Sequence, residues 1–264
     1  MKDWFGVSEG TEDFSDSGAH EWDGVFELVQ CRRALSPSGL PHLTYALNPY
    51  GGCEHGCVYC YAPEVTHQQW DGWRVVKVKT NVVSRLSREL PGLSGTIGIG
   101  TVTDPYQGAE KRFRLTRKCL EILSSKSFGV EIYTKSDLVL RDTDLLKSMR
   151  CTVGVTVTTL DERISKITEP GAPMPSVRLD TLCKLRSEGI DCFAMVAPVL
   201  DHLSDHEDEF AEALASTGVE RAMVDPLNRR PQLMQRLERM GFGCSPSQAA
   251  VVADSLRAHG IRVD

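Results

Sequence analysis

"ALNPYGGCEHGCVYCYAP", residues 46–63, carries three cysteines within eight positions, Cys53, Cys57 and Cys60, in the spacing Cys-x3-Cys-x2-Cys. The triplet follows a predicted β-strand at residues 43–48, which places it on a loop at the carboxyl end of that strand. Parallel α/β folds bind their ligands at this end of the sheet. The glycines of the loop allow the positive φ angles that a short loop needs to surround a compact ligand. The segment therefore predicts a ligand site.

The rest of the chain alternates β-branched runs with helical segments. The predicted strands are residues 43–48, 96–103, 130–135, 152–159, 192–199 and 221–226, and helical patterns cover residues 115–126, 143–149, 177–189 and 205–216. The last helix is predicted to begin with a capping box of Ser204 and Glu207. Gly189 and Gly218 are predicted to end helices in the left-handed conformation. This alternation indicates an α/β fold with a parallel sheet, open or closed, and six units favour a partial (β/α)6 TIM-like barrel.

The composition is that of an ordinary folded domain. Hydrophobic residues make up 41% of 264 residues, and no apolar run approaches the roughly 18 residues that span a bilayer. Residues 26–264 are predicted to form one domain. Residues 1–25 are acidic and are predicted to be a mobile lead-in, closed by Trp22 and Phe26 docking on the domain. The start has no signal-peptide pattern, and nine cysteines favour a reducing cytoplasm over a disulfide framework.

One segment of this acidic chain is basic. The net charge is −6, so the chain as a whole is not built to attract phosphates. The segment EKRFRLTRK, residues 110–118, is strongly basic. It is either the solvated face of one helix, with Phe113, Leu115 and Leu120 inside, or a contact for a polyanion.

The cysteine triplet leaves one metal ligand unassigned. A structural zinc site needs four ligands, and the nearest candidates are His55, between two of the thiols, and His67, in a predicted helical stretch. A cubane iron–sulfur cluster also usually takes four cysteines. Three cysteines without a fourth partner therefore favour a cluster with one iron open for chemistry, and zinc binding or plain burial is the alternative.

The pattern Cys-x3-Cys-x-aromatic-Cys, with Tyr59 as the aromatic residue, resembles the signature of radical S-adenosylmethionine (SAM) enzymes. The resemblance implies that Cys53, Cys57 and Cys60 hold a [4Fe–4S] cluster and that SAM chelates its fourth iron. It implies reductive cleavage of SAM to a 5′-deoxyadenosyl radical, which abstracts hydrogen from a substrate. It also implies a fold of the radical SAM type and an electron donor such as a flavodoxin or ferredoxin.

Longer segments resemble the spore photoproduct lyase-like branch of that superfamily, whose members are often called DNA repair photolyases. They are NPYGGCEHGCVYCYAP, GTVTDPYQGAEKRFRLTRKCLEIL, TKSDLVLRDTDLL, TVTTLDERISKITEPGAP and MVAPVL, and the resemblance covers roughly residues 30–225. It implies that Tyr59 lies beside the adenine and that Lys135 and Thr156 contact the cofactor. Thr101 and Thr103 end a predicted strand on the same face and could reach the methionine amino group.

One position departs from the lyase pattern. The cysteine that returns hydrogen to the product radical in the lyase falls on Thr101 or Val102. An alcohol O–H is a far poorer hydrogen-atom donor than a thiol. Among the other thiols, Cys119 and Cys183 are predicted to be buried in helices. The prediction is a radical SAM enzyme of unidentified substrate, with a nucleic-acid lesion or base among the candidates, and a non-catalytic iron–sulfur or zinc protein as the alternative.

Overall fold

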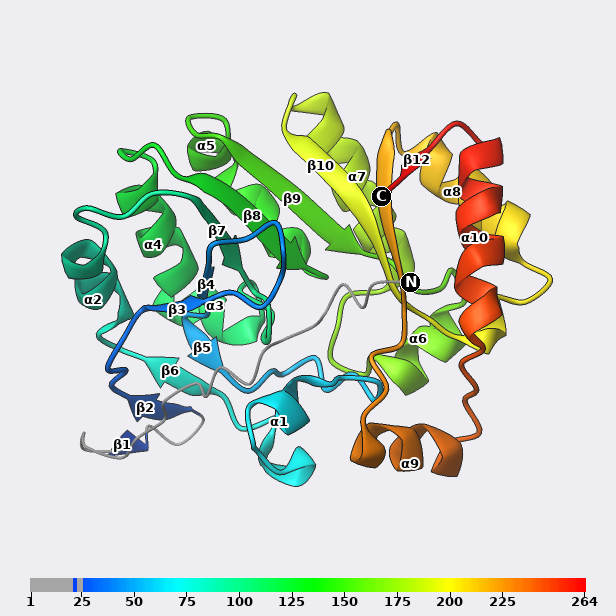
Figure 1. Ribbon diagram of the computed structural model, residues 1–264, viewed down its shortest axis with the longest axis horizontal. Coiled ribbons are helices and arrows are strands. Elements are labelled where there is room, and N and C mark those ends of the chain that lie inside the picture. The colour runs from blue at the N-terminus through cyan, green and yellow to red at the C-terminus, as the bar shows by residue number, and fades with distance from the viewer. Residues whose placement is uncertain (1–20, 23–25) are drawn as a thin grey trace. The chain divides into compact units, whose positions relative to one another are not determined.

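The computed structural model describes residues 21–22 and 26–264, which fall into two units (Figure 1). Unit 1 takes in the described residues up to His55, then Ala62–Thr134 and Arg141–Cys151. Unit 2 takes in Gly56–Tyr61, Lys135–Leu140 and Thr152–Asp264. The predicted lead-in lies outside the described residues except for a short strand at 21–22, and the single-domain boundaries stay a prediction.

Unit 1 contains two sheets and the helices that cover them. Its elements are β1 (Glu21–Trp22), β2 (Glu27–Val29), β3 (Leu35–Pro37), β4 (Tyr45–Leu47), β5 (Tyr50–Gly51), α1 (Ala62–Val65), the 3-10 helix Trp70–Gly72, β6 (Lys77–Lys79), α2 (Val82–Glu89), β7 (Thr96–Ile99), α3 (Gly108–Phe113), α4 (Leu115–Leu123), β8 (Gly129–Thr134) and α5 (Thr143–Leu146). The 3-10 helix Asp137–Asp142 begins in the part of the chain assigned to unit 2 and ends in unit 1.

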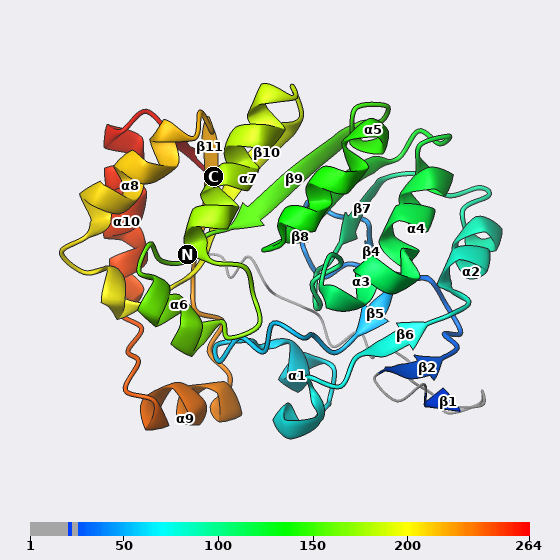
Figure 2. The same cartoon turned by 180° about the vertical axis from the view of Figure 1, so that it is seen from behind.

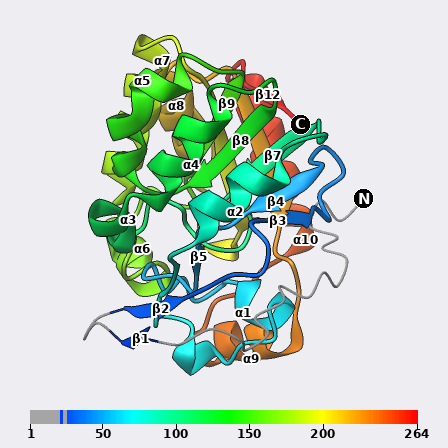
Figure 3. The same ribbon diagram turned by 90° about the vertical axis from the view of Figure 1, so that its left-hand side faces the viewer.

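The larger sheet of unit 1 has the strand order β3-β4-β7-β8, and β4, β7 and β8 run parallel. The smaller sheet has the order β1-β2-β6-β5 and lies below β3 and β4 in Figure 3. Helices α3 and α4 stand in front of β7 in Figure 2, and α4 also packs against α2. Ile97, Ile99 and Leu120 are fully buried, so the apolar face of α4 and the parallel strands supply the core of this unit.

Unit 2 repeats the strand–helix alternation. Its elements are β9 (Cys151–Thr156), α6 (Glu162–Thr168), α7 (Pro175–Ser187), β10 (Asp191–Val199), the 3-10 helix Asp201–Leu203, α8 (Glu207–Ser216), β11 (Arg221–Pro226), α9 (Pro231–Arg239), α10 (Pro246–Ala258) and β12 (Arg262–Val263). These strands are parallel in the order β9-β10-β11-β12. Helix α7 packs on β10, and α10 packs on α8 and β11.

The six predicted strands are all present, as β4, β7, β8, β9, β10 and β11. Strand β7 is shorter than predicted, because Gly100 follows it with a φ of +90° and a Cβ there would lie 2.6 Å from the carbonyl oxygen of Tyr133. Gly189 and Gly218 have φ angles of +73° and +76°, which confirms the predicted helix ends. The predicted capping box is wrong: α8 begins after His206, which makes no side-chain capping bond, and Ser204 ends the preceding 3-10 helix.

The basic segment 110–118 is not one solvated helix. Arg114 has a φ of +54° and separates α3 from α4, so the predicted single helix is wrong. Lys111, Arg112 and Lys118 are exposed, as the solvated-face interpretation expects. Glu110, by contrast, is fully buried.

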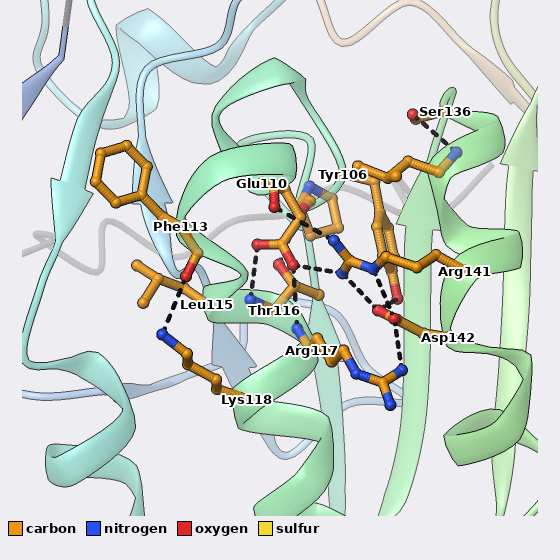
Figure 4. A network of polar contacts seen from close by, with 12 residues as sticks. Tyr106, Glu110, Phe113, Leu115, Thr116, Arg117, Lys118, Ser136, Arg141 and Asp142 are labelled. Carbon is orange, nitrogen blue, oxygen red and sulfur yellow. Dashed lines mark hydrogen bonds and ion pairs between the residues drawn. The ribbon is translucent and has the colours of Figure 1, made fainter.

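Glu110 and Asp142 organise a buried polar network in unit 1 (Figure 4). Glu110 accepts hydrogen bonds from the Tyr50 hydroxyl at 2.5 Å and from the Thr116 amide at 2.9 Å. Arg141 lies 2.7 Å from Glu110 and 2.8 Å from Asp142, so one guanidinium serves both carboxylates. Because Tyr50 lies three residues before Cys53, this network fixes the backbone that leads into the cysteine loop.

We expect the substitution Glu110→Ala to lower the free energy of unfolding by about 3–5 kcal/mol, because it leaves a buried phenol and a buried amide without their acceptor and removes one of the two carboxylates that Arg141 serves. Urea unfolding followed by circular dichroism measures the loss. Glu121→Ala is the matched control: Glu121 pairs with Arg117 at 3.3 Å, but its side chain is 50% exposed. The control should cost about 0.5 kcal/mol or less. Equal losses in the two variants would contradict the structural role of the network.

Candidate functional site

Cys53 lies in unit 1 on a backbone turn that requires glycine. It follows β5, a strand of the smaller sheet, so the loop does not leave β4 directly as the sequence predicted. Gly52 has a φ of +72°, and a Cβ there would lie 2.6 Å from the carbonyl oxygens of both Trp73 and Val75. The Cys53 amide donates to the Trp73 carbonyl at 2.9 Å. The turn thus presents Cys53 from a backbone that only glycine can form.

Thr103 holds the same turn from the other side. Its hydroxyl donates to the Gly52 carbonyl at 2.5 Å and accepts from the Gln107 side-chain amide at 3.0 Å. Thr101 accepts a hydrogen bond from the Asn48 side chain at 3.2 Å. Both predicted cofactor residues therefore have protein partners, and their contact with SAM stays a prediction.

His55 belongs to a buried pair. Its Nδ1 lies 3.4 Å from the Asp104 carboxylate, and both side chains are buried. Asp104 also accepts from the Thr134 hydroxyl at 2.8 Å. His67, the other candidate zinc ligand, lies in a turn after α1 with a φ of +54° and is exposed, so its predicted helical setting is wrong.

Cys57 and Cys60 lie in unit 2 on a tightly held loop. The Cys60 amide donates to the Cys57 carbonyl at 3.0 Å, and the Val58 amide donates to the Thr168 carbonyl at 2.8 Å. Arg236 of α9 donates to the carbonyl oxygens of Val58 and Cys60, at 2.5 and 2.9 Å. These contacts fix the loop backbone without using the thiols.

The side chains of this loop pack into an apolar group under α9. It consists of the buried residues Cys57, Val58, Tyr59, Leu200, Leu227, Leu233 and Leu237, with Cys60, Tyr61, Met234, Phe242 and Cys244 packed against them. Burial raises the pKa of the Cys57 thiol to about 12. The thiol is therefore protonated at neutral pH, and a bound metal would have to displace that proton.

Glu169 is the centre of a buried polar network behind the loop. Its carboxylate accepts from the Tyr59 hydroxyl, and from the Thr158 hydroxyl at 3.1 Å. Arg178 lies 2.5 Å from the carboxylate, and both side chains are fully buried. Burial opposes the charge, but Arg178 and then Lys135 outweigh it and hold the pKa of Glu169 at about 2. The carboxylate is therefore ionised at neutral pH.

The predicted cofactor residues of unit 2 all touch this network. Lys135 lies 3.9 Å from Glu169, and its ammonium group is 5.5 Å from the centre of the Tyr59 ring. Arg178 donates to the backbone carbonyl of Thr156 at 3.4 Å. Burial and the neighbouring Glu169 raise the pKa of Tyr59, so its phenol stays neutral. The structure thus brings Tyr59, Lys135 and Thr156 together around one ion pair.

Sequence reasoning missed Glu169, Arg178 and Arg236. The only signal for Glu169 is its place in the segment TEPGAP, directly before Pro170 and Gly171. Of the other thiols, Cys119 is buried as predicted, but Cys183 is exposed, so its predicted burial is wrong: it lies on the outer side of α7. In the described part of the chain, no three His, Cys, Asp or Glu side chains are gathered to hold a metal ion. The three cysteine ligands stay a prediction.

Parallel strands alternating with helices place the protein in the α/β class of folds. A family model for the Radical SAM superfamily matches residues 47–214. The chain belongs to that superfamily and is a radical SAM enzyme. Membership implies SAM, an iron–sulfur cluster and a reductant.

Two relatives and one solved structure illustrate the likeness. An uncharacterised protein of Mycobacterium tuberculosis is 35% identical over 234 residues, covering 80% of this chain and 68% of its own. An uncharacterised protein of Methanocaldococcus jannaschii is 33% identical over 184 residues, covering 68% and 69%. A spore photoproduct lyase complexed with dinucleoside spore photoproduct matches with a TM-score of 0.66 and 14% identity, covering 89% of this chain and 80% of its own. This last likeness shows the fold and confirms the fold class predicted from sequence.

Among the described helices, none is both long and apolar enough to cross a membrane.

We expect Gly52→Ala to destabilise the protein by about 2–5 kcal/mol, because it adds a steric clash with two carbonyl oxygens to the strain of a positive φ. Gly92→Ala is the control: Gly92 has a φ of +81° but open space around a Cβ. It should cost about 1 kcal/mol, the strain alone. Denaturant unfolding separates the two contributions. A Gly52 variant no less stable than the Gly92 variant would show that the turn is not sterically closed.

Glu169→Gln should lower the free energy of unfolding at pH 7 by about 3–5 kcal/mol, because it leaves Arg178 buried without a charge partner. The folded-state pKa of Glu169 lies below its unfolded value, so its contribution is present above pH ~4.5 and is lost as the pH falls toward about 2. The difference in the free energy of unfolding between wild type and the Glu169→Gln variant should become smaller as the pH falls over that range. The exposed Glu162→Gln is the control and should have little effect at any pH. A pH-independent difference would refute the assigned ionisation.

Proposed function

We propose that Cys53, Cys57 and Cys60 hold a [4Fe–4S] cluster and that the protein uses it to cleave SAM reductively and abstract hydrogen from a substrate. The observation that carries the proposal is the build of the cysteine loop. Its backbone is fixed by Gly52, Thr103 and Arg236, while the three thiols form no disulfide. Held backbone and unoxidised thiols are what a thiolate-ligated cluster requires.

The residue types of the loop suit such a group. Thiolates are the ligands that iron–sulfur clusters select. Gly52 has no side chain, so the backbone just before Cys53 can lie close to the carbonyl oxygens of Trp73 and Val75. When bound, the cluster supplies the electron that splits the sulfonium of SAM, yielding methionine and the 5′-deoxyadenosyl radical.

The chain's own residues then bind and orient the cofactor. The ammonium group of Lys135 suits the methionine carboxylate, because charge-assisted pairs are strong when partly buried. Its 3.9 Å approach to Glu169 limits where that ammonium can lie. The Tyr59 ring offers an apolar surface for adenine, and its hydroxyl is held by Glu169. Thr101, Thr103 and Thr156 supply hydroxyl groups for the ribose and the amino group.

The substrate is proposed only as a class. The lyase that shares the fold is complexed with a dinucleoside photoproduct, which makes a nucleic-acid lesion or base the first class to test. The lyase's hydrogen-return step is not expected here, because Thr101 and Val102 carry no thiol. The alternative occupant of the cysteine loop is zinc, for which His55 beside Asp104 would be a candidate ligand region.

Anaerobic reconstitution tests the proposal. We expect about four irons per chain and release of 5′-deoxyadenosine when dithionite and SAM are added. Alanine substitution of Cys53, Cys57 or Cys60 should remove iron and lower product formation by more than about a hundredfold. Cys183→Ala, at an exposed thiol, is the control and should keep both. Zinc without sulfide would favour the alternative, and a fully loaded cluster that yields no deoxyadenosine would overturn the proposed chemistry.

A further inference from the structure

We propose that α9 and the turn after it form the docking surface for an acidic one-electron carrier protein that reduces the enzyme. This inference rests on the proposed function, since it names the partner that the cluster requires. The surface is defined as the exposed parts of residues 228–242, and we call it the α9 surface.

The α9 surface lies directly over the loop that carries two of the three cysteines. The inward side of α9 places Leu233 and Leu237 in the same buried apolar group as Cys57 and Tyr59. Arg236 donates to the backbone carbonyl oxygens of Val58 and Cys60. One helix, about 10 Å across, therefore separates this surface from the cysteine loop, and hydrogen bonds join the helix to that loop.

The charge of this surface is opposite to that of the chain. Residues 228–242 contain four arginines and one glutamate; without Arg236, which bonds to the loop, their net charge is +2, whereas the whole chain carries −6. Arg236 is directed to the loop, while Arg229 and Arg239 are exposed. A basic patch on an acidic protein steers an acidic partner to one place and raises its association rate.

The apolar residues of the surface favour a protein partner over a nucleic acid. Met240 is 40% exposed, and Met234 and Phe242, which pack against the buried apolar group, are partly exposed. Methionine, aromatic residues and arginine are enriched at the centre of protein interfaces, whereas a phosphate backbone is bound mainly by rows of basic and polar groups. A segment that exposes arginines together with methionine and phenylalanine side chains matches the first pattern.

The transfer itself is simple. The reduced carrier loses one electron and the oxidised cluster gains it, with no proton or group transferred. The carrier dissociates in its oxidised form, which leaves the site free for the next reduction.

Binding tests the inference without relying on turnover. Oxidised flavodoxin, an acidic carrier, is titrated calorimetrically into the reconstituted full chain at low ionic strength. The double substitution Arg229→Glu and Arg239→Glu should raise the Kd about tenfold or more, and added salt should weaken wild-type binding. The control reverses two exposed basic residues of unit 1, Arg88→Glu and Lys126→Glu, and should bind like wild type. If the double glutamate variant does not fold, the double substitution Arg229→Gln and Arg239→Gln removes the two charges without reversing them and should raise the Kd by a smaller factor.

Reduction by two routes separates this inference from the proposed function. With dithionite, the Arg229 and Arg239 variants should cleave SAM at the wild-type rate; with reduced flavodoxin, they should be slower by about the factor seen in binding. Three results would overturn the assignment of the α9 surface as the docking site. The variants could bind flavodoxin as tightly as wild type, they could lose SAM cleavage with both dithionite and flavodoxin, or they could lose only the binding of an oligonucleotide. If wild type cleaves no SAM even with dithionite, the proposed function fails, whereas the binding result still decides the docking surface.

Discussion

The buried ion pair between Glu169 and Arg178 is the constraint on which the arrangement of unit 2 depends. Burying two charges costs several kcal/mol for each ion, and a short, hydrogen-bonded contact offsets that cost only if both partners stay in place. The 2.5 Å approach and the hydroxyls of Tyr59 and Thr158 satisfy this condition. Any movement of α6 or α7 would separate the charges, so the pair fixes the position of Tyr59 in the cysteine loop.

Unit 1 restrains its cysteine by a different means. The turn before Cys53 depends on the absence of a side chain at Gly52, and the buried Glu110 holds Tyr50 just upstream. In each unit, backbone contacts hold the segment that carries the cysteine. Such restraint suits a ligand bound by short side chains, because a two-atom cysteine side chain cannot compensate for a displaced backbone.

Local patterns were enough to predict the six parallel strands, since β-branched runs and turn residues mark them along the chain. The error at Arg114 arose because no residue type there signals a left-handed conformation. In the candidate site, the spacing of three cysteines was visible in sequence, but their supports were not. Arg236 is 176 positions from Cys60. The role of Glu169 depends on how helices pack around it, and no local sequence pattern specifies that packing. Contacts of this kind come from tertiary packing.

Membership of the Radical SAM superfamily gives the class of chemistry, and individual residues decide its outcome. In this chain the loop after β7 has Thr101 and Val102, fixed by Asn48 at 3.2 and 3.3 Å. An alcohol O–H bond is stronger than a thiol S–H bond, so the Thr101 hydroxyl is a far poorer hydrogen-atom donor than a cysteine would be. The substrate radical of the proposed function would therefore need a hydrogen-atom donor at another position.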